Sequence, residues 1–331
     1  MTTRQVRAQP SLARSIADFV AYLRGERRAA AHTVAAYERD LLQLSEFLTA
    51  RLGHAPALRE VGKLELRAWL AELTRLVGTS SVARKLSSVR AFFKYTTREE
   101  PSRENPAAEL ATPRLRRPLP LVLGTDAAAQ VMEAPTRGGP EGAAPPDDAR
   151  SAARASRDRL IVELLYGCGL RVHELAALDM DALRLEAGHL AVTGKGRKDR
   201  RVPVGRKCQA AYDDYVLQRS ALCHPKTGAR DPRALLLSRH GRRLGVRQIQ
   251  NLVKRYGVEG AGRPDLHPHA LRHSCATHML EGGADIRVIQ EFLGHQSLST
   301  TQRYTHLSIG RLLSVYDQSH PLAIAPRKTK R

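Results

Sequence analysis

Large apolar residues recur every three or four positions through the first hundred residues of the chain. This spacing puts apolar side chains on one face of a helix, so it predicts a run of amphipathic helices over residues 11–98. The predicted apolar faces contain Leu12, Ile16, Phe19, Val20 and Leu23; Tyr37, Leu41, Leu44, Phe47 and Leu48; Trp69, Leu70 and Leu73; and Val82, Leu86, Val89, Phe92 and Phe93. We therefore expect a helical N-terminal domain over residues 1–100.

A proline-rich stretch follows this domain. Proline cannot continue a helix, because it lacks the backbone N–H and its ring clashes with the preceding turn. Residues 101–120 are therefore interpreted as an interdomain linker that precedes a second domain, residues 121–331. The linker also carries candidates for phosphate contacts. These are Arg114, Arg116 and Arg117.

The second domain mixes helical spacing with short strand-like runs. Residues 134–156 are rich in Pro, Gly and Ala, which predicts a mobile surface insertion. Helical spacing resumes at Arg157, and further helices are predicted over 246–256, 268–280, 286–293 and 300–313; the predicted strands are 189–193, 201–204 and 235–238. The first two strands flank a basic, turn-rich hairpin tip at residues 194–199. The expected fold is mainly α with a small antiparallel β-sheet.

The chain carries a large excess of positive charge. Its 331 residues include 54 Lys and Arg against 33 Asp and Glu, a formal net charge of +21. Such an excess favours a polyanionic partner, above all nucleic acid. A membrane surface is the alternative, but we find neither a basic amphipathic helix nor a lipidation motif nor an apolar run of about 18 residues. We therefore expect no membrane insertion.

The cysteines and the N-terminal residues bear on the compartment. The four cysteines are scattered without a C-x-x-C pair, which fits a reducing environment better than structural disulfides. The first ten residues are polar and lack the apolar core of a signal peptide. A cytoplasmic, nucleic-acid-binding protein is the expectation.

Two groups of cations are candidates for DNA binding. Arg84, Lys85, Arg90 and Lys94 are interleaved with the apolar positions of the fourth predicted helix. They fit a helix laid along a DNA groove, and they equally fit a solvated helix face. The second group is at the hairpin tip, where Arg197 and Lys198 follow Lys195.

Several residues of the second domain suit phosphodiester chemistry, which needs a nucleophile, cations at the non-bridging oxygens and an acid for the leaving oxygen. Arg171 follows a glycine pair, with Glu174 three residues on. A guanidinium grips two phosphate oxygens at once, and a carboxylate would hold its fork in place. Alone, this pair is a weak signal, because such a spacing is more often a surface i,i+3 ion pair.

A histidine and an arginine share one face of the helix that is predicted to begin near Pro268. His269 and Arg272 are three residues apart, and proline is favoured in a first helical turn. Zinc is the competing interpretation of this segment, because His267, His269, His273 and His278 are close together. The segment has no H-E-x-x-H motif, and no acidic or cysteine residue accompanies the histidines at ligand spacing, which disfavours zinc. We expect no metal site.

Tyr304 is the candidate nucleophile, although a lone tyrosine is usually a packing residue. The order Arg171, Lys195, His269, Arg272, His295 and Tyr304 resembles the catalytic set of the tyrosine recombinase (phage integrase) family in order and spacing. Flanking segments resemble the family as well: Gly169-Leu170-Arg171, Gly194-Lys195-Gly196, Leu271-Arg272-His273-Ser274, Ala276-Thr277-His278, Leu293-Gly294-His295 and residues 298–306. Within the family the chain is most similar to the Xer recombinases. The insertion and His267 depart from the Xer pattern.

The resemblance implies a fold and a mechanism. The fold is a two-domain clamp around DNA, with a helical core-binding domain and a helical catalytic domain that has a small antiparallel sheet. Tyr304 attacks the scissile phosphate and forms a 3′-phosphotyrosyl link, which a 5′-hydroxyl then resolves without ATP, cofactor or metal. Arg171, Arg272 and His295 stabilise the phosphorane, Lys195 protonates the leaving oxygen, and His269 assists proton transfer.

The resemblance also implies partners. A Xer recombinase acts on a double-stranded DNA recombination site in a heterotetramer with a XerD-like partner, and it resolves chromosome dimers at cell division under an FtsK-type translocase. Three alternatives stay open at this point. They are an integrase of a mobile element, a type IB topoisomerase and a non-catalytic DNA-binding protein.

Overall fold

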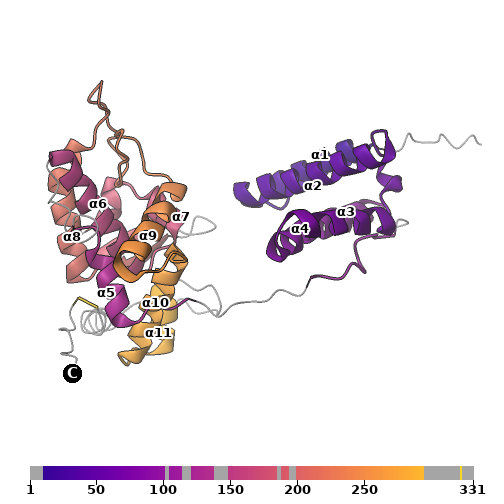
Figure 1. Cartoon of the computed structure of the whole chain (residues 1–331). Coiled ribbons are helices and arrows are strands. Elements are labelled where there is room, and N and C mark those ends of the chain that lie inside the picture. The colour runs from indigo at the N-terminus through magenta and orange to yellow at the C-terminus, as the bar shows by residue number, and fades with distance from the viewer. Residues whose placement is uncertain are drawn as a thin grey trace, which may run out of the picture. The chain divides into compact units, whose positions relative to one another are not determined.

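The computed structural model describes residues 10–100, 104–113, 121–137, 148–184, 188–193, 199–293 and 321–322. The chain divides into two compact units, residues 1–118 and residues 119–331 (Figure 1). Each unit has a hydrophobic core of its own. Among the described residues, no helix combines the length and the apolar character needed to cross a membrane.

The described part of the N-terminal unit is built from four α-helices. They are α1 (Leu12–Gly25), α2 (Ala31–Leu52), α3 (Lys63–Leu76) and α4 (Thr79–Glu99), with a 3-10 turn, η1 (Leu58–Glu60), before α3. The core consists mainly of the positions that the periodicity selects, such as Leu12, Leu44 and Leu86, each with 0% of its surface exposed. Tyr37, Phe47 and Leu70 pack against this core while partly exposed. The predicted amphipathic helices are confirmed.

Part of the expected linker packs onto the N-terminal unit. Ala107 and Leu110 are 0% and 4% exposed and belong to the core of that unit. Arg90 of α4 donates to the hydroxyl of Thr112 at 2.8 Å and to the carbonyl of Leu110. Prolines prevent a helix here, but two apolar residues three positions apart still bury their side chains. Residues 104–113 are therefore part of the folded unit, and residues 114–120 lie outside the described residues.

The described part of the C-terminal unit surrounds one buried helix. The helices are α5 (Thr125–Glu133), α6 (Ala149–Tyr166), α7 (Val172–Ala177), α8 (Arg206–Gln218), α9 (Val246–Ala261), α10 (Pro268–Glu281) and α11 (Ile286–Leu293), with 3-10 turns η2 (Met180–Ala182) and η4 (Arg219–Ala221). Leu160, Ile161, Leu164 and Leu165 of α6 are at most 1% exposed. Helix α6 is buried on every side near its C-terminal end, so that end is held firmly where the chain turns toward Arg171.

A three-stranded antiparallel sheet completes this unit, in the order β1 (Leu183–Arg184), β2 (His189–Thr193), β3 (Asp199–Pro203). Leu190 pairs with Val202. The predicted hairpin is confirmed. The predicted strand over 235–238 is wrong: this segment makes one isolated bridge, between Leu237 and Arg243.

The buried segment that was expected to be a strand has its backbone satisfied partly by side chains and partly by single bonds to separate backbone groups, such as the bond from the N–H of Leu235 to the carbonyl of Leu178 at 2.9 Å. The hydroxyl of Tyr215 donates to the carbonyl of Leu235 at 3.1 Å and accepts from the N–H of Leu237 at 3.2 Å. Arg219 also donates to the carbonyls of Leu235 and Ala234. A short apolar run signals burial, but it does not by itself signal a neighbouring strand.

The predicted insertion over 134–156 is wrong at its C-terminal end. Helix α6 begins at Ala149, and the carboxylate of its N-cap residue Asp148 accepts a hydrogen bond from the N–H of Ser151 at 2.5 Å. Ala153 is fully buried. Alanine is the best helix former, so two turns can form without large apolar residues. Residues 138–147 lie outside the described residues. The expected fold class, mainly α with a small antiparallel sheet, is confirmed.

Candidate active site

The turn between α6 and α7 brings Arg171 to the site. Gly169 adopts a φ of +55°, a left-handed conformation that glycine tolerates best. A Cβ atom at this position would lie 2.7 Å from Cδ2 of Leu293. The lack of a side chain therefore lets the end of α11 approach the turn closely. Arg171 follows as the N-cap residue of α7.

Arg171 is held by Glu174, as the sequence suggested. Nη1 of Arg171 lies 3.0 Å from Oε1 of Glu174, and the backbone N–H of Arg171 donates to Oε2 at 2.8 Å. Arg200 of β3 contacts the same carboxylate, with Nη1 and Nη2 at 2.6 and 2.8 Å from Oε1 and Oε2. Burial alone would raise the pKa of Glu174, but the hydrogen bonds from Arg200 and Arg171 outweigh it and lower the pKa to about 2. Glu174 is therefore ionised at neutral pH.

Arg272 is the most deeply placed cation of the site, with 6% of its surface exposed. Its two terminal nitrogens donate to the carbonyls of Gly169 and Leu293. The side chain thus joins α10, the turn before Arg171 and the end of α11. Burial, followed by repulsion from Arg171 and Arg200, lowers the pKa of Arg272 to about 10. The guanidinium still carries its charge at neutral pH.

His267 and His269 have different roles at the start of α10. His267 is the N-cap residue, and its Nδ1 accepts from the N–H of Ala270 at 2.9 Å. His267 thus replaces the small polar cap that is usual at this position. His269 is exposed. Loss of hydration lowers its pKa below 6.5, and His267, Arg272 and Arg171 lower it further. The imidazole is therefore neutral at pH 7 and able to accept a proton.

The histidines that were considered as zinc ligands do not form a group that could hold a metal ion in the described part of the structure. His278 is buried: the hydroxyl of Tyr166 donates to its Nδ1 at 2.7 Å, and its Nε2 lies 2.8 Å from the carbonyl oxygen of Leu123. Within the described ranges, no group of three or more His, Cys, Asp or Glu residues is placed to hold a metal ion. The contacts of His267 and His278 are those of a capping residue and a core residue.

The structure brings together Arg171, His269 and Arg272 of the predicted catalytic set. Lys195, His295 and Tyr304 lie outside the described residues, as do Arg197 and Lys198. Sequence reasoning missed Arg200, which shares Glu174 with Arg171. Arg200 lies one residue before the predicted strand over 201–204; the available signal was its spacing of two from Val202, which places it on the same face once the strand begins earlier, at Asp199.

The candidate DNA-binding residues of α4 differ in their surroundings. Lys85 is 6% exposed, and its ammonium contacts Oδ1 of the buried Asp40 at 3.1 Å, so the expectation that it faces DNA is corrected. Arg84 also pairs with Asp40, although its side chain is 48% exposed. Arg90 donates hydrogen bonds to Leu110 and Thr112, and Lys94 is exposed. A buried aspartate needs cationic partners, and this need explains the inward turn of Lys85.

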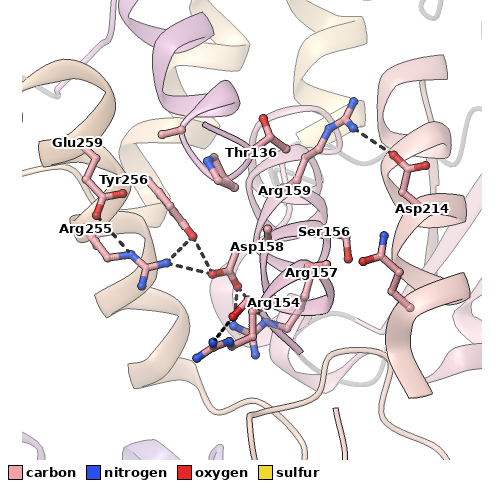
Figure 2. A pocket seen from close by; sticks show the side chains of 16 residues that line it. Thr136, Arg154, Ser156, Arg157, Asp158, Arg159, Asp214, Arg255, Tyr256 and Glu259 are labelled. Atoms are coloured by element: carbon pink, nitrogen blue, oxygen red, sulfur yellow. Dashed lines mark hydrogen bonds and ion pairs between the residues drawn. The ribbon is translucent and has the colours of Figure 1, made fainter. Parts of the chain in front are cut away.

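A cavity of about 620 Å³ with several charged side chains in its lining is formed by residues of α6, α8 and α9, among others, and Arg171, His269 and Arg272 are not part of that lining (Figure 2). Asp158 of α6 accepts from Arg157 at 2.6 Å, from Arg255 at 3.1 Å and from the hydroxyl of Tyr256 at 2.8 Å. Figure 2 shows these side chains converging on Asp158 from α6 and α9. The cavity is lined by none of the predicted catalytic residues. Its charges pair with one another and connect the two helices.

Comparison with known proteins places the chain in a family. Residues 146–311 match the phage integrase family, and residues 16–100 match the phage integrase N-terminal SAM-like domain. The chain therefore belongs to the phage integrase family of tyrosine recombinases, which makes it a site-specific DNA recombinase.

Two proteins that are similar to this chain are both named tyrosine recombinase XerC. The tyrosine recombinase XerC of Pelobacter propionicus is 41% identical over 315 residues, which cover 95% of this chain and 98% of that protein. The tyrosine recombinase XerC of Mycobacterium tuberculosis is 42% identical over 310 residues, covering 92% and 98%. The similarity to the Xer recombinases that the sequence indicated is confirmed.

Solved structures share the fold at low identity. The Tn1549 transposon integrase in complex with transposon right end DNA has a TM-score of 0.65 at 18% identity, covering 93% of this chain and 95% of that one. The XerH site-specific recombinase bound to a palindromic difH substrate, in a post-cleavage complex, has a TM-score of 0.62 at 19% identity, covering 93% and 82%.

Proposed function

We propose that this recombinase cleaves and rejoins DNA through a 3′-phosphotyrosyl intermediate on Tyr304, and that it acts as a XerC-type enzyme. The observation that supports the chemistry best is the placement of Arg272. Its buried guanidinium stays charged and lies close enough to Arg171 to feel its repulsion. It is bonded to the carbonyl of Gly169, two residues before Arg171, and two guanidinium groups at one site are favourable for the two non-bridging oxygens of a phosphodiester.

In this mechanism the phenolic oxygen of Tyr304 attacks the scissile phosphorus, and the bond to the 5′-oxygen breaks. Arg171 and Arg272 offset the charge on the pentacoordinate phosphorane, and His295 adds a hydrogen bond to it. His269 in its neutral form accepts the proton of the phenol, and Lys195 protonates the departing 5′-oxygen. A 5′-hydroxyl of another strand then attacks the phosphotyrosine and restores the tyrosine. Because the bond energy is conserved, no ATP is required, and because guanidinium groups take the Lewis-acid role, no metal ion is required.

The proposed cellular role is the resolution of chromosome dimers at cell division in the cytoplasm. In this role the protein binds a double-stranded recombination site together with a XerD-like partner, as a heterotetramer that an FtsK-type translocase controls. The identity of about 40% to proteins named XerC over more than nine tenths of the chain supports this role over that of a mobile-element integrase.

Covalent trapping tests the chemistry. A nicked suicide duplex that carries the recombination site should yield a covalent protein–DNA adduct in excess EDTA, since guanidinium groups take the place of a Lewis-acid metal. Tyr304→Phe should bind the same duplex in a gel-shift assay and form no adduct, because only the attacking oxygen is lost. An adduct that persists in Tyr304→Phe would place the nucleophile elsewhere, and Tyr316 would be tested next.

Recombination of a plasmid with two directly repeated sites tests the role. Deletion of the intervening DNA should require both this protein and the XerD-like recombinase of the same organism. Complete recombination by this protein alone would contradict the heterotetramer and favour a mobile-element integrase.

A further inference from the structure

Arg200 is a charged residue on the inward face of the sheet. It pairs with Val192 across β2 and β3, two positions from the pair of Val202 with Leu190. Val192, Leu190 and Val202 are at most 1% exposed. Because side chains alternate along a strand, Arg200 shares this buried face, whereas Arg201 is exposed on the other one. An inward arginine is costly unless a partner compensates its charge.

The partner is the carboxylate that also holds Arg171. Arg200 approaches both oxygens of Glu174 in a fork-to-fork arrangement, and its side chain is 18% exposed. The Glu174 side chain is 6% exposed. Its two oxygens also accept from Nη1 and from the backbone N–H of Arg171. One carboxylate therefore fixes both the strand and the arginine at the start of α7.

The charges of this group have a consequence for Arg171. A lone Arg171–Glu174 pair would be neutral overall, and its guanidinium would be occupied by the carboxylate. With Arg200 on the same carboxylate, the three side chains carry a net charge of +1. The hydrogen bonds from Arg200 also fix the orientation of Glu174 and so fix the direction in which it pulls the Arg171 fork.

We propose that Arg200 is a positioning residue for Arg171: it orients and neutralises Glu174, so that the Arg171 guanidinium stays aimed at the scissile phosphate and available to it. This inference rests on the proposed role of Arg171 at that phosphate. Arg200 itself contacts Glu174 and acts through it.

Replacement of Arg200 should slow cleavage without abolishing DNA binding. In Arg200→Ala the guanidinium of Arg171 turns toward the uncompensated Glu174, and single-turnover cleavage should fall by about 10- to 100-fold. Arg200→Lys keeps the charge but loses the paired hydrogen bonds, so its loss should be intermediate. Arg201→Ala is the matched control, because it removes the same charge from the same strand on the opposite face.

A substrate change separates this role from a structural one. Each variant is compared with the wild type on a suicide duplex with a scissile phosphate and on the same duplex with a neutral methylphosphonate at that position. The methylphosphonate lacks the charge that Arg171 offsets. The defect of Arg200→Ala relative to the wild type should therefore shrink by at least about 10-fold on this substrate, as should the defect of Arg171→Ala. A folding defect would lower cleavage of both substrates equally.

Three results would overturn the inference. The first is an equal defect of Arg200→Ala on both substrates while Arg171→Ala shows the expected rescue; this result leaves the proposed role of Arg171 intact. The second is an absence of rescue in both variants, which removes the role of Arg171 as well. The third is recovery of the cleavage rate of Arg200→Ala on a duplex with a 5′-bridging sulfur. A sulfur leaving group needs no protonation, so this recovery would show that Arg200 acts through the leaving-group acid. If Arg200→Ala does not fold, Arg200→Lys carries the same comparisons.

Discussion

Arg272, Arg171 and His269 are held by different means, and each means suits a different chemical role. Arg272 is anchored by two backbone carbonyls, which are neutral groups that fix its position and leave its positive charge in place. Arg171 is oriented by a carboxylate that Arg200 shares. His269 stands beside these cations, which oppose its protonation. Loss of hydration, together with these neighbouring charges, lowers the pKa of the histidine and keeps it neutral, the form needed for a base.

The pH dependence of cleavage should report this neutral His269. Because its pKa is lowered from 6.5, the imidazole stays unprotonated at neutral pH and gains a proton only below pH 6.5. The single-turnover cleavage rate should be flat near pH 7 and should fall with a midpoint below 6.5. His269→Gln should be slower at pH 7 by about 10- to 100-fold and should lose this acidic limb. An unchanged limb in His269→Gln would assign the titration to another group.

The turn between α6 and α7 determines how closely the end of α11 can pack against it, because Gly169 in this turn has no side chain. Gly169→Ala would combine an unfavourable left-handed backbone with a contact of 2.7 Å to Leu293. We expect a loss of at least about 2 kcal/mol in unfolding free energy and slower cleavage, measured by urea denaturation and covalent trapping. Gly228→Ala is the matched control: its φ is +67°, but its added Cβ meets nothing within 4 Å. It should cost about 1 kcal/mol. Equal losses would remove the role of the close approach.

The ion pairs of Asp158 connect α6 and α9, and their loss should lower the free energy of unfolding. Asp158→Asn leaves Arg157, with a side chain only 6% exposed, without its carboxylate partner. Removal of one partner from a buried ion pair costs about 3 kcal/mol or more, so urea unfolding should shift clearly. Asp214→Asn in the same cavity is the control (Figure 2): this carboxylate is 53% exposed and should cost less than about 1 kcal/mol. A change below about 1 kcal/mol in Asp158→Asn would mean that packing alone holds the two helices together.

The net charge of +21 predicts that the affinity of the whole molecule for DNA depends strongly on salt concentration. DNA binding should release counterions from many phosphates, so the logarithm of affinity should fall with the logarithm of salt concentration with a slope of about −5 or steeper. Fluorescence anisotropy with a duplex of the recombination site measures this slope. Tyr304→Phe should show the same slope, because it loses only the reacting oxygen. A nearly flat line would contradict binding through many phosphate contacts.

Many of the elements, and the family, could be predicted from the amino-acid sequence alone. Apolar spacing located the helices of the N-terminal unit, because one face of each helix is buried, and it located α9, α10 and α11 in the other. The alternation of side chains located the hairpin of β2 and β3. Catalytic residue types in a fixed order indicated a tyrosine recombinase, since the chemistry of phosphodiester cleavage restricts which residues can serve.

Contacts between segments that are distant in the sequence could be found only in the folded structure. The burial of Lys85 against Asp40 and the sharing of Glu174 by Arg171 and Arg200 join residues that are 45 and 26 to 29 positions apart. Local periodicity carries no information about such pairs. The segment at 235–238 shows the same limit: its apolar run correctly indicates burial, but its backbone bonds to the hydroxyl of Tyr215 and to separate backbone groups and not to a neighbouring strand. A charge or a polar backbone group must find a partner, and the fold alone selects which one.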